Sequence, residues 1–318
     1  MRVLITGVSG FVGGALACRL LNEGSYRVRG AGRRVFSNAP AGLELCQSPE
    51  LEAEADWSEL LQDVEVVVHA AARVHMMSDQ AADPLSEFRR ANTEGTLRIA
   101  RQAVEAGVRR FVFISSIKVN GEESPADRPY SADDVGAPVD PYGVSKHEAE
   151  QALQALARET GLEVVIIRPV LVYGPGVKAN FQSMMRWLDR RLPLPLGAIH
   201  NSRSLVSLDN LVDLIVTCLQ HSAAAGQVFL VSDGSPLSTT QLLRRMGLAL
   251  GKPARLLPIP AVWLQLIARL LGRPAIAQRL CGSLCVDIEK TRRLLGWEPP
   301  VTVDEAMSRT ARYFQEHR

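Results

Sequence analysis

The sequence predicts an α/β protein built on a doubly wound parallel sheet, with a smaller C-terminal lobe. Three observations support this fold class. Strand-like and helix-like segments alternate through the first half, a glycine-rich turn follows the first strand, and the alternation stops near residue 168. Such alternation is typical of parallel sheets whose connecting helices cover both faces. The chain has 318 residues, 47% of them hydrophobic, which is enough for a large buried core.

Five strands are expected in the first half, because short apolar runs recur there. The run 64–69 is almost continuously apolar, as expected of a strand buried on both faces of a parallel sheet. The expected strands are residues 2–6, 26–30, 64–69, 109–116 and 162–167.

Three helices are expected between these strands. The first ends near Gly24, the second covers 85–106, and the third covers 141–160. Glycine commonly ends a helix because it adopts the left-handed conformation at little cost. Asp140 suits the N-cap of the third helix, and Pro141 suits its first position, where the missing N–H is not needed.

The second half has a different composition. Prolines and glycines gather there at 169–176, 193–197 and 251–260. We therefore expect a nucleotide-binding domain at 1–168, joined by part of 203–232. Residues 169–318 are then expected to form mainly a substrate lobe over the carboxyl ends of the strands, where open α/β sheets bind ligands.

Charge and cysteine content exclude several classes of protein. Basic and acidic side chains number 36 and 34, so bulk electrostatics gives no support for binding to nucleic acid or to a membrane surface. The five cysteines form no Cys-x-x-Cys pair, which argues against a disulfide framework or a zinc site. No secretion signal pattern opens the sequence, and a cytoplasmic location is expected.

One apolar segment, 256–271, needs separate comment. It contains prolines, a glutamine and an arginine, and it is short for a span of roughly 20 residues. We expect a buried or interfacial helix, with docking on a membrane surface as the alternative, and no membrane span.

The turn after the first strand has the composition of a phosphate-binding loop. Three glycines, Gly7, Gly10 and Gly13, are spaced as Gly-x-x-Gly-x-x-Gly directly after the strand. This chemistry needs a tight turn, close approach of the backbone to a pyrophosphate, and a helix N-terminus aimed at it. The candidate cofactor-binding residues here are Gly7, Ser9, Gly10, Phe11, Val12 and Gly13.

The residues after the second strand indicate which dinucleotide is bound. An NAD enzyme usually has an acidic residue there to bond the ribose 2′-hydroxyl. This chain has Arg33 and Arg34 instead, and two guanidiniums suit a 2′-phosphate. We therefore predict NADP, with NAD as the alternative. Asp56 is a candidate for the adenine edge.

A tyrosine and a lysine four residues apart, Tyr142 and Lys146, open the third helix on one face. A phenol is a poor acid–base group at neutral pH unless a neighbouring cation favours the phenolate. The strand before it ends in Ser115 and Ser116, which bring hydroxyls to the carboxyl edge of the sheet. A hydroxyl there can bond the same substrate oxygen as the tyrosine.

Together these residues resemble those of the extended short-chain dehydrogenase/reductases, in the nucleotide-sugar epimerase, dehydratase and reductase branch. The resemblance covers essentially the whole chain and implies a Rossmann-type domain. It implies that Tyr142 exchanges the proton, that Ser116 is the hydroxyl partner, and that Lys146 lowers the tyrosine pKa and holds the nicotinamide ribose. Ser115 is the adjacent alternative for the hydroxyl and lines the cofactor site.

The same resemblance assigns further residues. It implies cofactor contacts at Ala70, Ala71, Ala72, Pro169 and Val172, and a geometry-keeping role for Asn92. In the second lobe it implies a nucleotide-diphosphate site, for which the candidates are Asn180, Arg203 and Lys178. His75 falls in the loop that lies near the sugar in such enzymes, although an ordinary loop histidine is an equal reading.

Two departures from the family pattern favour a reductase over an epimerase. The arginine pair favours NADPH, and Asn120 replaces the tyrosine usual in the Ser-x-x-x-Val-Tyr-Gly run. A dehydratase is disfavoured because Ile117 and Lys118 stand where an Asp-Glu pair is usual. The closest resemblance is to bacterial enzymes that reduce a UDP-2-acetamido-2,6-dideoxy-4-keto-hexose to UDP-N-acetyl-quinovosamine or -fucosamine for O-antigen.

Two alternatives remain at this stage. One is a UDP-hexose or UDP-N-acetylhexosamine 4-epimerase, and the other is a non-catalytic NADP-binding sensor. The partner implied in each enzymatic case is a UDP-sugar, with no nucleic acid. The family often forms homodimers through helices equivalent to 85–106 and 142–160, and a homodimer is expected here.

Overall fold

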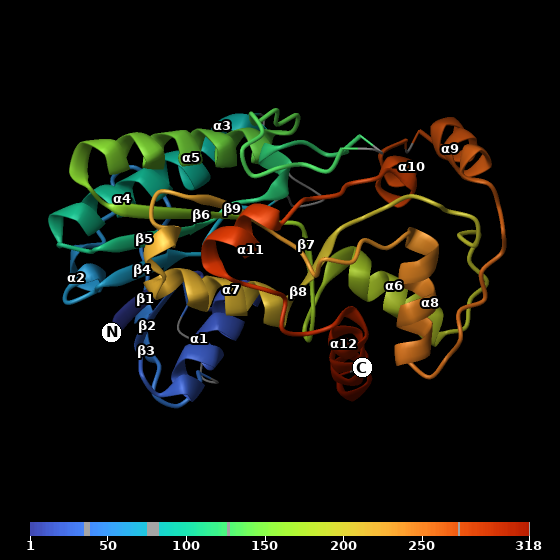
Figure 1. Cartoon of the computed structure of the whole chain (residues 1–318), viewed down its shortest axis with the longest axis horizontal. Coiled ribbons are helices and arrows are strands. Elements are labelled where there is room, and N and C mark those ends of the chain that lie inside the picture. Colours follow the sequence, from blue (N-terminus) through green and yellow to red (C-terminus); the bar gives the residue numbers. More distant parts are fainter. Residues whose placement is uncertain (35–38, 75–82, 126–127, 273, 318) are drawn as a thin grey trace.

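The computed structural model describes residues 1–34, 39–74, 83–125, 128–272 and 274–317. Seven parallel strands form the central sheet in the order β3-β2-β1-β4-β5-β6-β9 (Figure 1). This order confirms the expected fold class. The strands are β1 (Arg2–Thr6), β2 (Arg27–Gly32), β3 (Glu44–Gln47), β4 (Val66–His69), β5 (Arg110–Ile114), β6 (Glu163–Pro169) and β9 (Val228–Val231).

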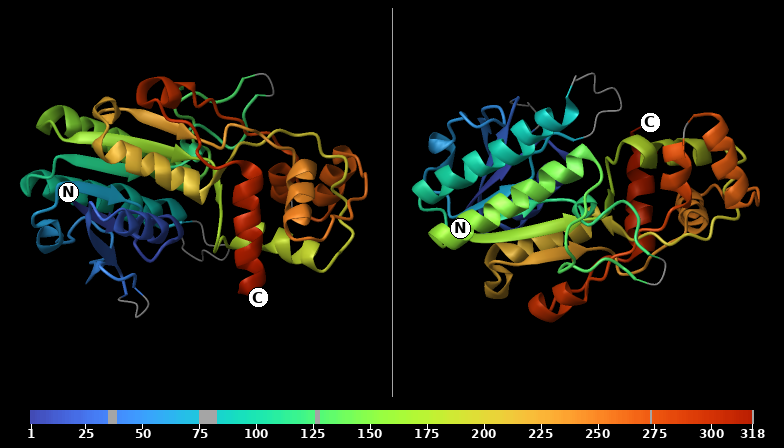
Figure 2. Two further views of the ribbon diagram at one scale, coloured as in Figure 1. Left: turned by 60° about the horizontal axis from the view of Figure 1, so that its bottom comes forward. Right: turned by 90° about the horizontal axis from the view of Figure 1, so that it is seen from above.

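Helices cover both faces of this sheet (Figures 1 and 2). One face packs against Leu16 and Leu20 of α1 (Phe11–Glu23) and against α7 (Leu208–Gln220). The other face packs against α4 (Gly95–Glu105) and α5 (Pro141–Thr160). The short α2 (Ser58–Leu61) and α11 (Glu289–Leu295) lie at the sheet periphery, and η3 covers Ser222–Ala224. Each face therefore has its own apolar core, as a doubly wound sheet requires.

The start of α5 follows the capping chemistry expected from the sequence. The Asp140 carboxylate accepts a hydrogen bond from the Gly143 N–H at 2.6 Å, and Pro141 occupies the first turn. Gly161 ends the helix in the left-handed conformation, with φ of 77°. These caps fix the register of the helix that carries Tyr142 and Lys146.

The helix expected over 85–106 is instead three pieces. These are α3 (Pro84–Phe88), the π-helical segment η1 (Arg89–Glu94) and α4. Apolar periodicity cannot distinguish a continuous α-helix from one with a π-helical insertion, so this insertion could not be predicted. Such insertions often occur at functional sites, and this one contains Asn92.

The second lobe is formed by a two-stranded parallel sheet, β7 (Leu171–Tyr173) with β8 (Leu205–Ser207), and by helices around a third apolar core. Figure 2 shows this lobe beside the carboxyl ends of the main strands. Its helices are α6 (Ala179–Asp189), α8 (Thr239–Ala249), α9 (Ala261–Leu270), α10 (Pro274–Cys281) and α12 (Val303–Glu316).

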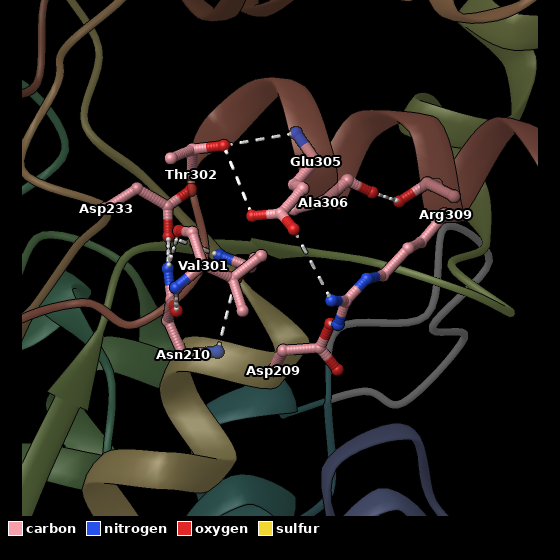
Figure 3. Close-up of polar contacts among 10 residues, drawn as sticks. Asp209, Asn210, Asp233, Val301, Thr302, Glu305, Ala306 and Arg309 are labelled. Atoms are coloured by element: carbon pink, nitrogen blue, oxygen red, sulfur yellow. Dashed lines mark hydrogen bonds and ion pairs between the residues drawn. The ribbon is translucent and has the colours of Figure 1, made fainter.

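A buried polar joint connects the lobe to the sheet (Figure 3). The Asn210 amide on α7 donates to the Val301 carbonyl at 2.8 Å and accepts from the Val301 N–H at 2.9 Å. It also donates to the Asp233 carboxylate at 2.7 Å, which accepts from the Tyr173 hydroxyl at 2.8 Å. Arg309 on α12 pairs with Asp209 at 2.7 Å nearby.

Asn210→Ala is expected to destabilise the whole chain. The substitution leaves both backbone groups of Val301 without their partner and removes one of the hydrogen bonds to the buried Asp233 carboxylate, which should lower the free energy of unfolding by about 2–4 kcal/mol. Urea denaturation followed by circular dichroism measures this. Ser308→Ala, at an exposed position on α12, is the control and should cost less than about 0.5 kcal/mol. Equal stabilities of the two variants would contradict the role of the joint.

Candidate active site

The glycine turn has room only for glycine. Gly7 has φ of +71°, and a side chain there would lie 2.8 Å from the Ala71 nitrogen. At Gly13 a Cβ atom would come within 2.3 Å of the Gly7 carbonyl oxygen. Gly10 is the N-cap of α1, and no side chain caps the first N–H groups of this helix. This arrangement fits a pyrophosphate at a helix N-terminus.

A cavity of about 900 Å³ opens beside this turn. Arg33 and Arg34 directly follow the last residue of β2, Gly32, and both line the cavity with Ser9 and Gly10. The structure therefore brings together the turn and the arginine pair that the sequence singled out. The full lining is Val8, Ser9, Gly10, Gly14, Ala17, Cys18, Arg33, Arg34, Pro40, Leu43 and Glu50.

Glu50 is the carboxylate that sequence reasoning missed at this cavity. It lies just beyond β3, a half-exposed edge strand of four residues that has no apolar run to identify it. Asp56, the predicted adenine contact, is exposed and accepts a hydrogen bond from the Ser58 N–H at 3.0 Å beside α2. It is not among the residues that line the cavity.

A buried histidine supports the alanines that follow β4. Its ring nitrogens contact the hydroxyls of Thr6 at 2.8 Å and Thr96 at 3.0 Å. Burial, and to a lesser degree the charge of Lys146, lower the pKa of His69 to about 3, so the imidazole is neutral. The Thr6 hydroxyl also accepts from the Ala71 N–H at 3.3 Å. These bonds hold the segment with Ala70, Ala71 and Ala72 against the glycine turn.

Asn92 connects the loop after β4 to the catalytic helix. Its amide forms two bonds with the Arg73 backbone, 2.8 Å from the N–H and 3.0 Å to the carbonyl. The same amide donates to the Ser145 hydroxyl at 3.1 Å. The π-helical segment η1 carries this buried side chain, and its expected role in maintaining the geometry of the site stays a prediction.

Tyr142 and Lys146 lie on consecutive turns of α5. The Lys146 ammonium is fully buried, donates to the Ile114 carbonyl at 2.9 Å, and lies 4.4 Å from the Phe113 ring centre. Burial lowers the pKa of Lys146 to about 7, although Glu150 opposes the shift. Burial, with a further contribution from Asp140, raises the pKa of Tyr142 to about 12.

The expected effect of the lysine on the tyrosine pKa therefore does not appear in this structure. Lys146 faces a carbonyl and an aromatic ring, and the desolvation of the phenol dominates its pKa. At neutral pH Tyr142 is a protonated phenol that can donate. Its ring also meets the edge of Phe88, with 5.9 Å between ring centres.

The two serines at the end of β5 have different partners. Ser115 is buried and donates its hydroxyl hydrogen to Glu150 at 2.5 Å. Ser116 is partly exposed, and its oxygen accepts from the Lys118 N–H at 3.2 Å, so its own hydrogen is available to another acceptor. The geometry favours Ser116 over Ser115 as the group that bonds a substrate oxygen.

A buried ion pair lies behind these residues. The Glu150 carboxylate accepts from the Arg168 guanidinium at 2.5–3.2 Å, and both side chains are almost fully buried. Arg168 also donates to Asn120 at 3.0 Å, and Asn120 donates to the Ser131 carbonyl at 3.1 Å. Asn120 is therefore part of the support of the site. Two of the predicted cofactor contacts lie close by in the sequence, Pro169 at the end of β6 and Val172 within β7.

The predicted diphosphate residues lie in two different environments. Arg203 is held between two segments of the lobe and donates to the carbonyls of Arg279 at 3.2 Å and Gly282 at 3.0 Å. Lys178 and Asn180 lie at the N-terminus of α6, and Lys178 lines a separate cavity of about 210 Å³ beside the end of α12. Their binding roles stay predictions. His75 lies outside the described residues.

The fold and site define a class of protein: a dinucleotide-dependent oxidoreductase with a tyrosine–lysine pair at the carboxyl edge of a doubly wound sheet. A family model described as the NAD dependent epimerase/dehydratase family matches residues 3–232. The chain belongs to this family, as the sequence resemblance indicated.

Relatives and solved structures agree with this assignment. A UDP-glucose 4-epimerase of Vibrio cholerae is 49% identical over 98% of this chain and 95% of its own length. A UDP-glucose 4-epimerase of Mycolicibacterium smegmatis is 29% identical over 99% of each chain. The structure of a UDP-glucuronic acid 4-epimerase from Bacillus cereus, in complex with UDP-glucuronic acid and NAD, superposes with a TM-score of 0.81 at 22% identity, covering 100% of both chains.

Lys146→Met is expected to change how stability depends on pH. Above about pH 7 the folded wild type has released the lysine proton, whereas the unfolded chain keeps it up to about pH 10.5, so the unfolded state binds more protons. The free energy of unfolding of the wild type, relative to the variant, should therefore rise by about 2 kcal/mol from pH 7 to pH 9. Guanidinium denaturation of both proteins at several pH values measures this difference in the free energy of unfolding. A constant difference over this range would contradict the burial of a titrating ammonium.

Proposed function

We propose that this chain reduces the C4 keto group of a UDP-2-acetamido-2,6-dideoxy-4-keto-hexose with NADPH. The product is UDP-N-acetyl-quinovosamine or -fucosamine for surface polysaccharide (O-antigen). One observation favours a reduction over an epimerisation. Arg33 and Arg34 line the dinucleotide cavity at the end of β2, where an NAD enzyme usually has an acidic residue. NADPH is the usual cellular reductant, and a reductase consumes it at each turnover.

The residues of the site fit this chemistry. A bound NADPH supplies a hydride to the C4 carbon. Tyr142 gives its proton to the C4 oxygen as the charge develops there, and the Ser116 hydroxyl donates a hydrogen bond to the same oxygen. A phenol whose pKa burial raises to about 12 is protonated at neutral pH and ready to donate. Lys146 lies one turn away, where it can bond the nicotinamide ribose.

The proposal divides the chain between cofactor and substrate. Residues 1–168, with part of 203–232, hold the dinucleotide, and 169–318 mainly hold the nucleotide sugar. Arg203, Lys178 and Asn180 are proposed to bind the diphosphate, and His75 the sugar.

The functional unit is proposed to be a homodimer that pairs α4 and α5, with a mass twice the 34.7 kDa of the chain. Light scattering during gel filtration tests the dimer.

A second candidate function is UDP-hexose or UDP-N-acetylhexosamine 4-epimerisation. The observation that favours it is the 49% identity to the Vibrio cholerae protein, which bears the name UDP-glucose 4-epimerase. An epimerase begins by removing a hydroxyl proton, so Tyr142 would have to act first as a base. It also returns the hydride within the same turnover, and NADPH would not be consumed.

Tyr142→Phe is expected to separate catalysis from binding. Purified protein is mixed with NADPH and UDP-4-keto-6-deoxy-N-acetylglucosamine, and the absorbance at 340 nm is followed. The wild type should oxidise NADPH in proportion to substrate, and the variant should be slower by at least about 100-fold, because the proton donor is lost. Tyr26→Phe, just before β2 at the opposite end of the sheet, where its hydroxyl accepts a hydrogen bond from Gln220, should keep the wild-type rate. Conversion of UDP-glucose or UDP-N-acetylglucosamine to its C4 epimer, without net oxidation, would replace the reductase by the epimerase.

Replacing both cavity arginines is expected to remove the preference for the 2′-phosphate. In Arg33→Ser/Arg34→Ser the KM for NADPH should rise by about 100-fold, since two charge-assisted bonds are lost, while the kinetics with NADH change little. Arg27→Ser, at the other end of β2, is the matched control and should leave the KM for NADPH and the KM for NADH unchanged. An equal rise in the KM for NADPH and in the KM for NADH would show that the arginines do not bind the 2′-phosphate.

A further inference from the structure

The outer helix of the second lobe, α9, packs on the third apolar core only through its less exposed side, which includes Ala261 and Leu264. None of the residues of α9 is buried, and its large apolar side chains are exposed, Trp263 by 58% and Leu270 by 79%. We call this surface the outer apolar face. It consists of Leu257, Val262, Trp263, Leu266, Ile267, Leu270 and Leu271. A soluble protein rarely leaves so many large apolar side chains together in water without a use for them.

The positions of these residues form a face and not a scatter. Residues 262, 263, 266, 267 and 270 recur at helical spacing, so they cover one side of α9. Ala261, Leu264 and Ala268 are less exposed and lie on the opposite side, toward the lobe. Figures 1 and 2 place α9 at the end of the lobe that is farthest from the main sheet. The face therefore points away from the rest of the molecule.

Basic residues outnumber acidic ones in the segments around this face, although Lys252 pairs with Asp189 and Arg245 pairs with Asp304. The chain has 34 acidic residues, yet residues 234–286 contain none, while they contain seven basic residues. The neighbouring stretch 190–208 also lacks an acidic residue, and backbone bridges at Leu194–Leu256 and Ala198–Pro260 hold it beside the entry to α9. The basic residues in these two stretches are Arg190, Arg191, Arg203, Arg244, Arg245, Lys252, Arg255, Arg269, Arg273 and Arg279.

We propose that the outer apolar face docks on the surface of an anionic lipid bilayer. In this arrangement α9 lies in the plane of the headgroups, its apolar side chains reach the acyl boundary, and exposed Arg255 and Arg269 contact anionic lipids. A tryptophan beside arginines and leucines is typical of such an interface. Balanced net charge does not oppose this, because attraction to a surface depends on the local charge.

A membrane span is not part of the proposal. The ten residues of α9 extend about 15 Å, half the thickness of a hydrocarbon core of about 30 Å. Among the described residues no helix is long and apolar enough to cross a membrane. The helix can lie on a bilayer but cannot cross it.

A second copy of the chain fits the face less well than lipid does. A symmetric contact would bring the same surface of both copies together, and with it two copies of Arg255 and Arg269 from segments that contain no acidic residue. Anionic headgroups supply the missing negative charge. This docking is independent of the proposed reductase activity, because the face includes no residue assigned to the active site.

Co-sedimentation of the full chain with vesicles tests the proposal. The wild type should bind vesicles of phosphatidylethanolamine and phosphatidylglycerol about tenfold more strongly than vesicles of phosphatidylcholine, and high salt should reduce that preference. The variant Trp263→Gln/Leu266→Gln/Leu270→Gln should lose at least about tenfold in binding to the anionic vesicles. Arg255→Ser/Arg269→Ser should lose the preference for anionic lipid and keep the weak binding to phosphatidylcholine.

A matched control carries the same chemical change elsewhere. Val135→Gln/Val139→Gln/Leu248→Gln replaces three exposed apolar residues outside the face and should bind like the wild type. Circular dichroism checks that every variant is folded. The proposal is overturned if the wild type does not sediment with anionic vesicles, or if the Trp263 variant and the control bind equally. It is also overturned if light scattering shows that the Trp263 substitutions dissociate a dimer while lipid binding is absent.

Discussion

The ion pair between Glu150 and Arg168 is the interaction on which the rest of the site depends. It joins the middle of α5 to the end of β6, and through Ser115 and Asn120 it also fixes the end of β5 and the loop that follows. A buried pair of this kind is costly to break, because the remaining charge would be left without a partner in a low-dielectric interior. The helix α5 therefore has one orientation relative to the strands whose ends form the candidate site.

The same interior also contains a buried lysine. Lys146 lies on this helix one turn before Glu150, bonds the Ile114 carbonyl and contacts the Phe113 ring. The surrounding interior disfavours its charge, and the same surroundings keep the neighbouring phenol protonated. The neutral His69 on the adjacent strand belongs to the same low-dielectric region. Acid–base properties at this edge of the sheet thus follow mainly from desolvation.

Much of this could be predicted from the sequence, because the strongest signals are local. Continuous apolar runs, the glycine spacing and the caps at Asp140 and Gly161 each reflect a constraint within a few residues. The edge strand β3 could not be found in this way, since it is short and half-exposed. Glu50 was missed for the same reason, and the π-helical turn at Asn92 leaves the apolar period almost unchanged.

The path of the chain between its two parts has a consequence for how the protein can be divided. After β6 the chain enters the lobe at β7, returns to the sheet in α7 and β9, and enters the lobe again at α8. It then contacts β9 once more through α11 before ending in α12, next to Asn210. Neither part is one continuous piece of sequence, and a cut after β6 divides the apolar core on the α1 and α7 side of the sheet, whose residues run from Val3 to Trp297. Because the chain passes between the two parts several times, a bend at one connecting segment cannot separate the lobe from the sheet.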